Sequence, residues 1–134
     1  MISSNLIIVV LITILIGVLI AVYFDFDLHP HPKLELSADQ VRTDRSRFRI
    51  VIDVRDQKER ELHGFYPNSI PIEINQLKKE VPFLIGSGLQ SLQTPILIYS
   101  NEGDHRSKKA AELLFHLGYK NVKYISKSYQ SLLP

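Results

Sequence analysis

Two different patterns of apolar positions divide the chain. Residues 6–24, LIIVVLITILIGVLIAVYF, form an unbroken uncharged run, whereas residues 34–134 alternate short apolar runs with segments of mixed polarity. The first pattern is typical of a membrane-spanning helix, because its 19 residues would cover roughly 28 Å, close to the hydrocarbon thickness of a bilayer. We therefore predict an anchor over residues 1–24, a linker over residues 25–33 and one folded domain over residues 34–134.

The domain is predicted to alternate strands and helices. The expected strands are residues 34–36, 48–52, 70–72, 95–99 and 121–125. The expected helices are residues 38–43, 56–62, 75–84, 107–117 and 129–133. This order favours a three-layer α/β/α fold with a parallel sheet. Ligands of such sheets bind beyond the carboxyl ends of the strands, which here are the loops after Asp53, Ile72 and Tyr99.

Several residues are predicted to begin or interrupt these helices. Ser37 and Ser107 are suited to cap the helices that follow them, and Asp56 with Glu59 forms the pattern of a capping box. Pro82 is expected to interrupt the third helix, because proline has no N–H to donate to the preceding turn.

A cleaved signal peptide and a buried core helix are the alternatives to a retained membrane anchor. A signal peptide needs a basic first segment and a small-x-small cleavage site, but MISSN has no basic side chain and AVYFDFD offers no good site. A core helix is rarely so long and so uniformly apolar. Lys33 and Arg42 follow the run closely, so the positive-inside rule favours a single-pass protein with a cytoplasmic C-terminal domain.

Composition excludes several kinds of chemistry. The chain has 16 Lys and Arg against 14 Asp and Glu, with no basic run, which gives no case for nucleic-acid binding. It has no cysteine, so disulfides, Cys-ligated zinc and thiolate catalysis are excluded. His29 and His31 in the linker are two histidines without further ligands, so we expect no metal and no cofactor.

The loop from Ser100 to Arg106 is the candidate binding site. Helix N-termini present unpaired N–H groups, and Gly103 allows the loop to curl so that more of them face inward and bind an anion. Arg106 could add further donors, whereas Glu102 and Asp104 would repel an anion. The candidate residues are Ser100, Asn101, Glu102, Gly103, Asp104, His105, Arg106 and Ser107. A small-oxyanion site and a plain strand-to-helix connection both remain open.

A set of motifs in fixed order gives this domain a likeness to a known family. The motifs are Ile50-Val-Ile-Asp-Val-Arg55, Glu59, Gly64-Phe-Tyr-Pro67, Tyr99-Ser-Asn-Glu-Gly103, Arg106-Ser-Lys-Lys-Ala-Ala111 and Leu117-Gly-Tyr-Lys-Asn-Val122. Together they resemble a single-domain rhodanese over residues 34–133. The resemblance implies a parallel sheet of about five strands between helices. It also implies sulfur transfer, with the sulfur carried as a persulfide on a loop cysteine.

The resemblance also implies roles for individual residues. Asp53 and Arg55 would support the carboxyl edge of the sheet, Gly103 would shape the loop, and Arg106 would face its anion-binding centre. Ser100 stands where the family has its cysteine, so sulfurtransferase activity is not expected. The loop is also one residue longer than in many single-domain members, and in length is closer to the related phosphatases.

Three functions are consistent with these observations. The leading hypothesis is a catalytically inactive rhodanese-like module on a membrane anchor, which binds a protein partner or a small oxyanion. The second is residual hydrolase or phosphatase chemistry, with Ser100 as nucleophile and His105 as base, although no third group is evident to orient that histidine. The third is a passive scaffold subunit of a membrane complex.

Overall fold

The computed structural model describes residues 3–28 and 33–133, with the backbone alone at residues 24–28 and at Ala38. The chain divides into two compact units, Met1–Lys33 and Leu34–Pro134. His29 and His31, for which the sequence predicts no metal, lie outside the described residues.

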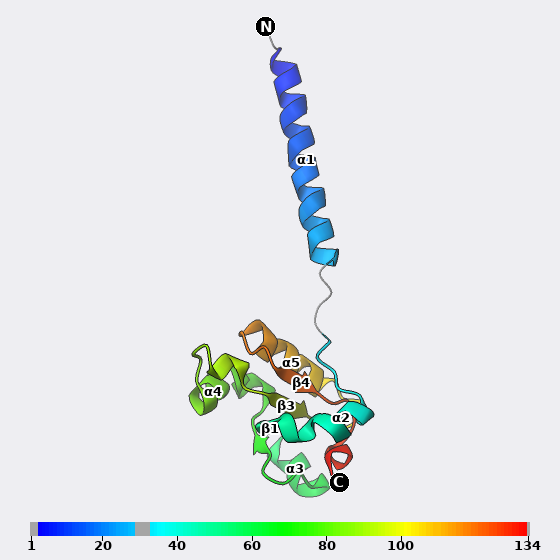
Figure 1. Ribbon diagram of the computed structural model, residues 1–134, viewed down its shortest axis with the longest axis vertical. Coiled ribbons are helices and arrows are strands. Elements are labelled where there is room, and N and C mark those ends of the chain that lie inside the picture. Colours follow the sequence, from blue (N-terminus) through cyan, green and yellow to red (C-terminus); the bar gives the residue numbers. More distant parts are fainter. Residues whose placement is uncertain (1–2, 29–32, 134) are drawn as a thin grey trace. The chain divides into compact units, whose positions relative to one another are not determined.

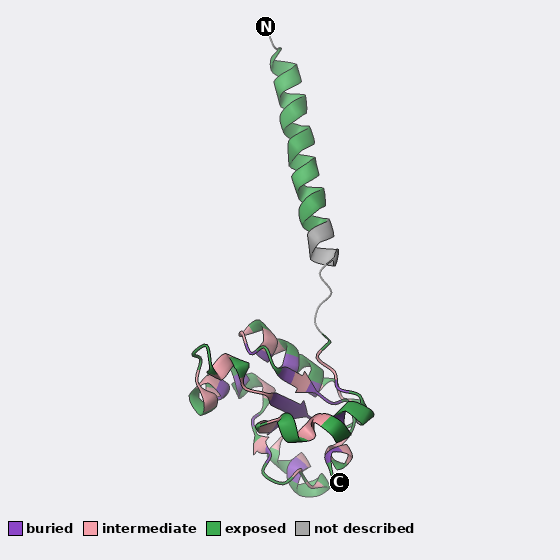
Figure 2. Ribbon diagram, viewed as in Figure 1, coloured by how far each residue is buried: buried purple, intermediate pink, exposed green. Residues whose placement is uncertain are grey.

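The first unit is one helix, α1 (Ser4–Leu28), which continues past the predicted boundary at residue 24. Its segment Ser4–Tyr23 has a mean hydropathy of 3.2 over 20 residues, and is long and apolar enough to span a membrane. The side chains of this segment are exposed along its whole length (Figure 2). Thr13 donates its hydroxyl to the carbonyl of Val9 at 2.8 Å, so its polar group is satisfied within the helix.

The second unit contains a parallel sheet, as predicted. Its strands are β1 (Ile50–Asp53), β2 (Ile70–Pro71), β3 (Ile96–Tyr99) and β4 (Val122–Tyr124), in the order β2-β1-β3-β4. All three pairings are parallel. β3 is buried at every position, as expected for a central strand covered on both faces.

The sheet of the described residues has four strands rather than five. The predicted strand at residues 34–36 makes one isolated bridge, Glu35 to Tyr124, with two hydrogen bonds of 2.9 Å between this segment and Tyr124. It cannot extend further because Ser37 immediately caps the next helix. The side chains and backbones of Ser37 and Gln40 bond reciprocally there, in a capping box.

Helices cover both faces of the sheet (Figure 1). α4 (Ile74–Ile85) and α5 (Arg106–His116) pack on one face, where Leu77, Val81, Ala110 and Leu114 join the larger apolar core. α2 (Ala38–Asp44) and the 3-10 helix η3 (Tyr129–Leu132) pack on the other. The remaining elements are η1 (Arg45–Arg47), α3 (Gln57–His63) and η2 (Ser91–Gln93).

Pro82 does not interrupt α4, contrary to the prediction. The helix continues to Ile85 and ends at Gly86, whose φ of 89° is readily adopted only by glycine. Pro82 lies in the last turn, where its own carbonyl accepts a hydrogen bond from Gly86 at 2.7 Å. The proline therefore removes one backbone hydrogen bond from α4, only three residues before the helix ends.

Candidate functional site

The carboxyl ends of β1 and β3 place the two candidate segments next to each other. Asp53 and Tyr99 are register partners, so Arg55 and Ser100 follow at the same edge of the sheet. α3 begins shortly after β1, and the loop from Ser100 runs into α5. Two groups of charged side chains form at this edge, one centred on Asp53 and one on Asp104.

The first group is a buried ion-pair network around Asp53. This carboxylate is fully buried and accepts three hydrogen bonds from Arg55, at 3.0, 3.0 and 2.8 Å. Arg60 of α3 donates to it at 2.8 Å, and the hydroxyl of Tyr99 at 3.0 Å. Arg55 continues to the carbonyl of Gly64 at 2.7 Å, and thus ties the end of β1 to the end of α3.

The same network fixes the residue immediately before the loop. The hydroxyl of Tyr99 lies 2.9 Å from that of Ser69 and accepts from the backbone N–H of Tyr66 at 3.0 Å. Burial raises the pKa of Asp53, but the hydrogen bonds and charge of Arg55 together have the larger, opposite effect. The pKa of Asp53 is therefore lowered from its ordinary value of 3.8. Burial likewise raises the pKa of Tyr99, which stays a neutral hydroxyl.

The second group closes the candidate loop on itself. The carboxylate of Asp104 accepts from the hydroxyl of Ser100 at 2.7 Å and from the backbone N–H of Asn101 at 3.1 Å. The backbone N–H of Arg106 donates to it at 3.1 Å, and the guanidinium of Arg106 at 3.0 and 2.7 Å. The donors expected to surround an oxyanion are therefore gathered around a carboxylate of the loop itself.

Arg106 is held by two carboxylates. Beside Asp104, it makes a two-pronged pair with Glu59 of α3, at 3.1 and 2.6 Å. The hydrogen bonds with Glu59, against the opposing effect of burial, raise the pKa of Arg106. Burial raises the pKa of Asp104, but hydrogen bonds from Ser100 and Arg106 lower it more, so it lies below 3.8 and the carboxylate is ionised at neutral pH.

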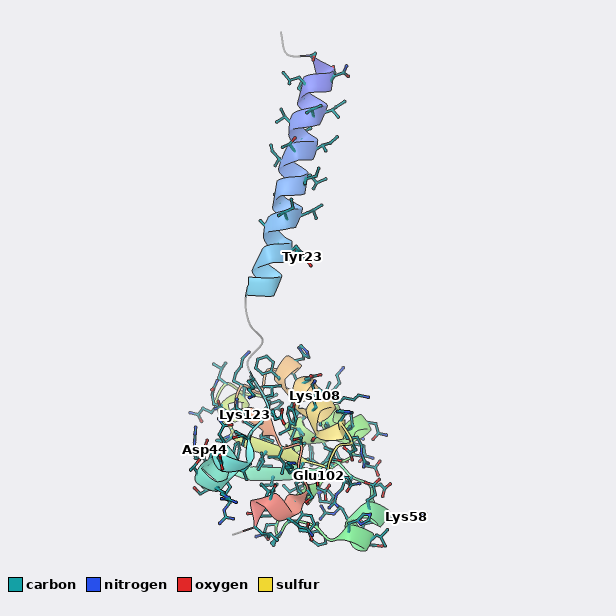
Figure 3. The ribbon with its side chains drawn as sticks, turned by 90° about the vertical axis from the view of Figure 1, so that its right-hand side faces the viewer. Tyr23, Asp44, Lys58, Glu102, Lys108 and Lys123 are labelled. Carbon is teal, nitrogen blue, oxygen red and sulfur yellow. The ribbon has the colours of Figure 1, made fainter. Side chains whose placement is uncertain are left out.

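The other residues of the loop serve its shape and its attachment. Asn101 donates to Glu59 at 3.0 Å and accepts from Arg55 at 3.3 Å, and so joins the two networks. Gly103 has a φ of 79°, as its predicted role in the turn requires. The exposed side chain of Glu102 pairs with Lys127 at 3.2 Å (Glu102 is labelled in Figure 3).

Ser107 is not the cap of α5, contrary to the prediction. The helix begins one residue earlier, at Arg106, after His105 in the left-handed conformation with a φ of 50°. Ser107 is buried, and its hydroxyl donates to the carbonyl of Ile125 at 3.1 Å. The side chain of Asp104, bonded to the N–H of Arg106, takes the place of a serine cap.

Glu59, Arg60 and Tyr99 were not predicted to belong to the site. The sequence pattern assigned Glu59 to a capping box with Asp56, and the backbone N–H of Glu59 does donate to Asp56 at 2.8 Å. Its carboxylate, however, turns to Arg106 instead of returning to the cap. The opposite charges of Glu59 and Arg106 could have predicted this pair, but only if the arrangement of α3 beside the loop had been known.

The geometry gives Ser100 no activating base. Its hydroxyl donates to Asp104, a carboxylate whose lowered pKa makes it a poor proton acceptor. Among the described hydrogen bonds none joins Ser100 to His105, whose side chain is exposed. A cavity of about 250 Å³ lies beside the loop, lined in part by Glu35, Asp104 and Lys108. The arrangement can hold a small polar group, but it lacks an activated nucleophile.

Comparisons with known proteins agree with this architecture. Residues 35–133 match the family model described as "Rhodanese-like domain". A rhodanese-related protein of Thermoplasma volcanium is similar in structure, with a TM-score of 0.57 and 24% identity over 76% of this chain and 90% of that one. The human single-domain sulfurtransferase TSTD1 gives 0.55 and 21%, over 76% of this chain and 95% of that one.

A third similar structure bears a different description. It is a protein of unknown function from Rhodopseudomonas palustris, described as a possible tyrosine phosphatase, with a TM-score of 0.56 and 21% identity over 75% of this chain and 77% of that one. At these identities the likenesses establish the fold. No curated protein matches the chain.

Proposed function

The chain belongs to the rhodanese-like domain family, and from this membership we propose that it is a membrane-anchored member that has lost sulfur transfer and acts by binding a protein partner. The observation that carries the proposal is the closed loop, in which Asp104 occupies the donors of Ser100, Asn101 and Arg106. The proposed loss of activity has two independent causes, which concern the nucleophile and the anion site.

The first cause is the missing sulfur atom. A persulfide needs a thiol, and the sequence has none at any position. Ser100 stands at the position of the family's cysteine, but a hydroxyl cannot carry sulfur in this way and is a weak nucleophile without a base. This favours binding over catalysis as the function of the domain.

The second cause is competition for the anion site. An external oxyanion would have to displace the carboxylate of Asp104, which is already positioned and pays no cost of association. The oxyanion would also be a third negative charge close to Glu59 and Asp104. A small oxyanion is therefore a weaker candidate ligand than a protein that recognises the closed loop.

The proposed anchor rests on α1. Its segment Ser4–Tyr23 has the length and mean hydropathy of a single-pass span, and Tyr23 projects from the helix at the end where an interfacial aromatic residue is expected (Figure 3). Lys33 and Arg42 follow the span, and the positive-inside rule then favours a cytoplasmic domain. A scaffold role in a membrane complex would use the same anchor without the loop.

Affinity capture from solubilised membranes tests the proposal. The full-length chain is compared with Asp104→Ala, which opens the loop, and with Glu102→Gln, a matched change of an exposed acid in the same loop. A partner retained by the wild type and by Glu102→Gln but lost from Asp104→Ala supports recognition through the closed loop. A partner that all three variants retain equally indicates a scaffold. If the capture enriches no protein, that result contradicts the proposal.

Direct assay tests the proposed inactivity. The wild type is expected to show no thiosulfate sulfurtransfer and no turnover of aryl phosphates or esters. Ser100→Cys alone should recover little sulfurtransfer, because Asp104 still fills the anion site, whereas Ser100→Cys with Asp104→Ala should recover more. Wild-type turnover that is lost in Ser100→Ala would overturn the assignment and favour a serine-dependent hydrolase.

A further inference from the structure

The edge of the sheet opposite the loop carries a separate surface. Residues 45–49, 86–95 and 116–121 lead into β1, β3 and β4, and α4 ends there. Because the strands are all parallel, this amino edge lies at the other end of the strands from Ser100. Figure 1 shows α4 and the segment that follows it lying away from α3, the helix beside the loop.

Large apolar side chains are exposed at this edge. Phe83 is 94% exposed, Leu89 86% and Leu84 46%. Phe83 and Leu84 line a hollow of about 440 Å³ together with Ile70. A second hollow, of about 520 Å³, shares Ile70 and Leu84 and is lined also by Arg49. Phe83 and Leu84 are neighbours on α4, and adjoining apolar exposure of this kind is typical of an interaction surface.

The same edge is basic. The three segments that lead into β1, β3 and β4 contain no Asp or Glu. Their Lys and Arg residues are Arg45, Arg47, Arg49 and Lys120. Lys79 and Glu80 of α4 both line the hollow of about 440 Å³. Arg47 pairs with Asp44 at 3.7 Å, and the guanidinium of Arg45 donates to the carbonyl of Leu132, so these two arginines already have partners within the domain. The two hollows are thus lined by two cations, Arg49 and Lys79, and by one carboxylate, Glu80.

An added strand is a poor occupant of this surface. β2 is the edge strand of the sheet on the side of α4, and it consists of Ile70 and Pro71. Proline has no N–H to donate to a further strand, which blocks extension of the sheet at this point. The occupant must instead accept projecting apolar side chains and attract cations.

We propose that this surface docks on the anionic face of the bilayer to which α1 is anchored. Phe83 and Leu89 would enter the headgroup region, and Arg49 and Lys120 would contact lipid phosphates. The inference rests on the proposed anchor: residues 28 and 34 are only six apart in the chain, so the anchor would tether the domain to the membrane that it spans. Docking in this way turns the loop at Ser100 toward the aqueous phase, where a partner can reach it.

The absence of cysteine permits a direct test. Leu89→Cys and, as a matched control, Leu62→Cys each give one labelling site, and Leu62 is a 79% exposed leucine on α3. Each full-length variant carries an environment-sensitive fluorophore and is reconstituted into nanodiscs of phosphatidylcholine alone or of phosphatidylcholine and phosphatidylglycerol in equal parts. The fluorophore at position 89 should shift to the blue in the anionic discs only, and the one at position 62 in neither.

Charge reversal provides a second measurement. Arg49→Glu in the Leu89→Cys background is expected to lower the docked fraction roughly tenfold, because it removes one attracted charge and adds one repelled charge. Equal emission from positions 89 and 62 in anionic discs overturns the inference and leaves the anchor intact. Failure of the full-length chain to float with carbonate-washed liposomes overturns both.

Discussion

The two aspartates at the carboxyl edge of the sheet meet similar partners at different depths. Asp53 is fully buried and is bound by two arginines and a tyrosine. Asp104, with 25% of its side chain exposed, is bound by one arginine, a serine and backbone N–H groups. The buried network holds the ends of β1 and β3 together, whereas the shallower one fills a loop. Depth therefore separates a carboxylate that joins two strand ends from one that closes a loop.

Removing the buried carboxylate should have the largest effect. Asp53→Asn leaves Arg55 and Arg60 without their negative partner in a site that excludes water, and should lower the free energy of unfolding by about 3–5 kcal/mol. Urea titration of the full-length protein in detergent measures the change. An effect as small as that of an exposed pair would show that Asp53 does not support the sheet edge as described.

Removing the cation shared by the loop should have an intermediate effect. Arg106→Gln leaves Asp104 and Glu59, both about three-quarters buried, facing each other without compensation, and should cost about 1–2 kcal/mol. The same urea titration measures it. Arg106→Lys should recover only part of the loss, since an ammonium cannot make both two-pronged contacts; full recovery would contradict the geometry.

Neutralising Asp104 should have a smaller effect on stability, with a distinct dependence on pH. Its pKa in the folded protein lies below 3.8, so its contribution is present above that pH and is lost as the pH falls through the folded value. Asp104→Asn should therefore lose about 1 kcal/mol at pH 7 and show a shallower decline in acid. Tm measured from pH 7 down to pH 3 gives both, and parallel curves for the two proteins would refute the assignment.

The exposed pair should have the smallest effect. Glu102 and Lys127 are each about 60% exposed, and Glu102→Gln should change the free energy of unfolding by about 0–0.5 kcal/mol. The change should shrink further in high salt. A loss comparable with that of Asp104→Asn would show that the whole loop, rather than its closed interior, depends on charge.

Local sequence patterns predicted most of the fold and the outline of the site. The apolar runs located the four strands of the described residues, whereas the supporting role of Asp53 and Arg55 at the sheet edge was implied only by the resemblance to single-domain rhodaneses. The fifth strand was overestimated because the capping preference of Ser37 ends it after a single bridge. The predicted interruption at Pro82 was wrong because proline in the last turn of a helix does not end the helix early.

The interior of the loop could not be predicted in the same way. Asp104 was expected to repel an anion, whereas it is itself the anion that the loop binds. Nothing in the order of residues indicates that a side chain folds back on its own loop. The contributions of Glu59 and Arg60 depend on α3 lying against the carboxyl ends of β1 and β3, which local spacing does not encode.

The hydroxyl of Tyr99 has a consequence for how such a domain can change over time. Tyr99 is held by Asp53 and Ser69, so the hydrogen bonds that fix the start of the loop come from residues outside it. Mutations at residues 101–105 can then accumulate while the sheet keeps its form. A protein that lost its catalytic activity could in this way keep its fold while the loop evolved a new binding function.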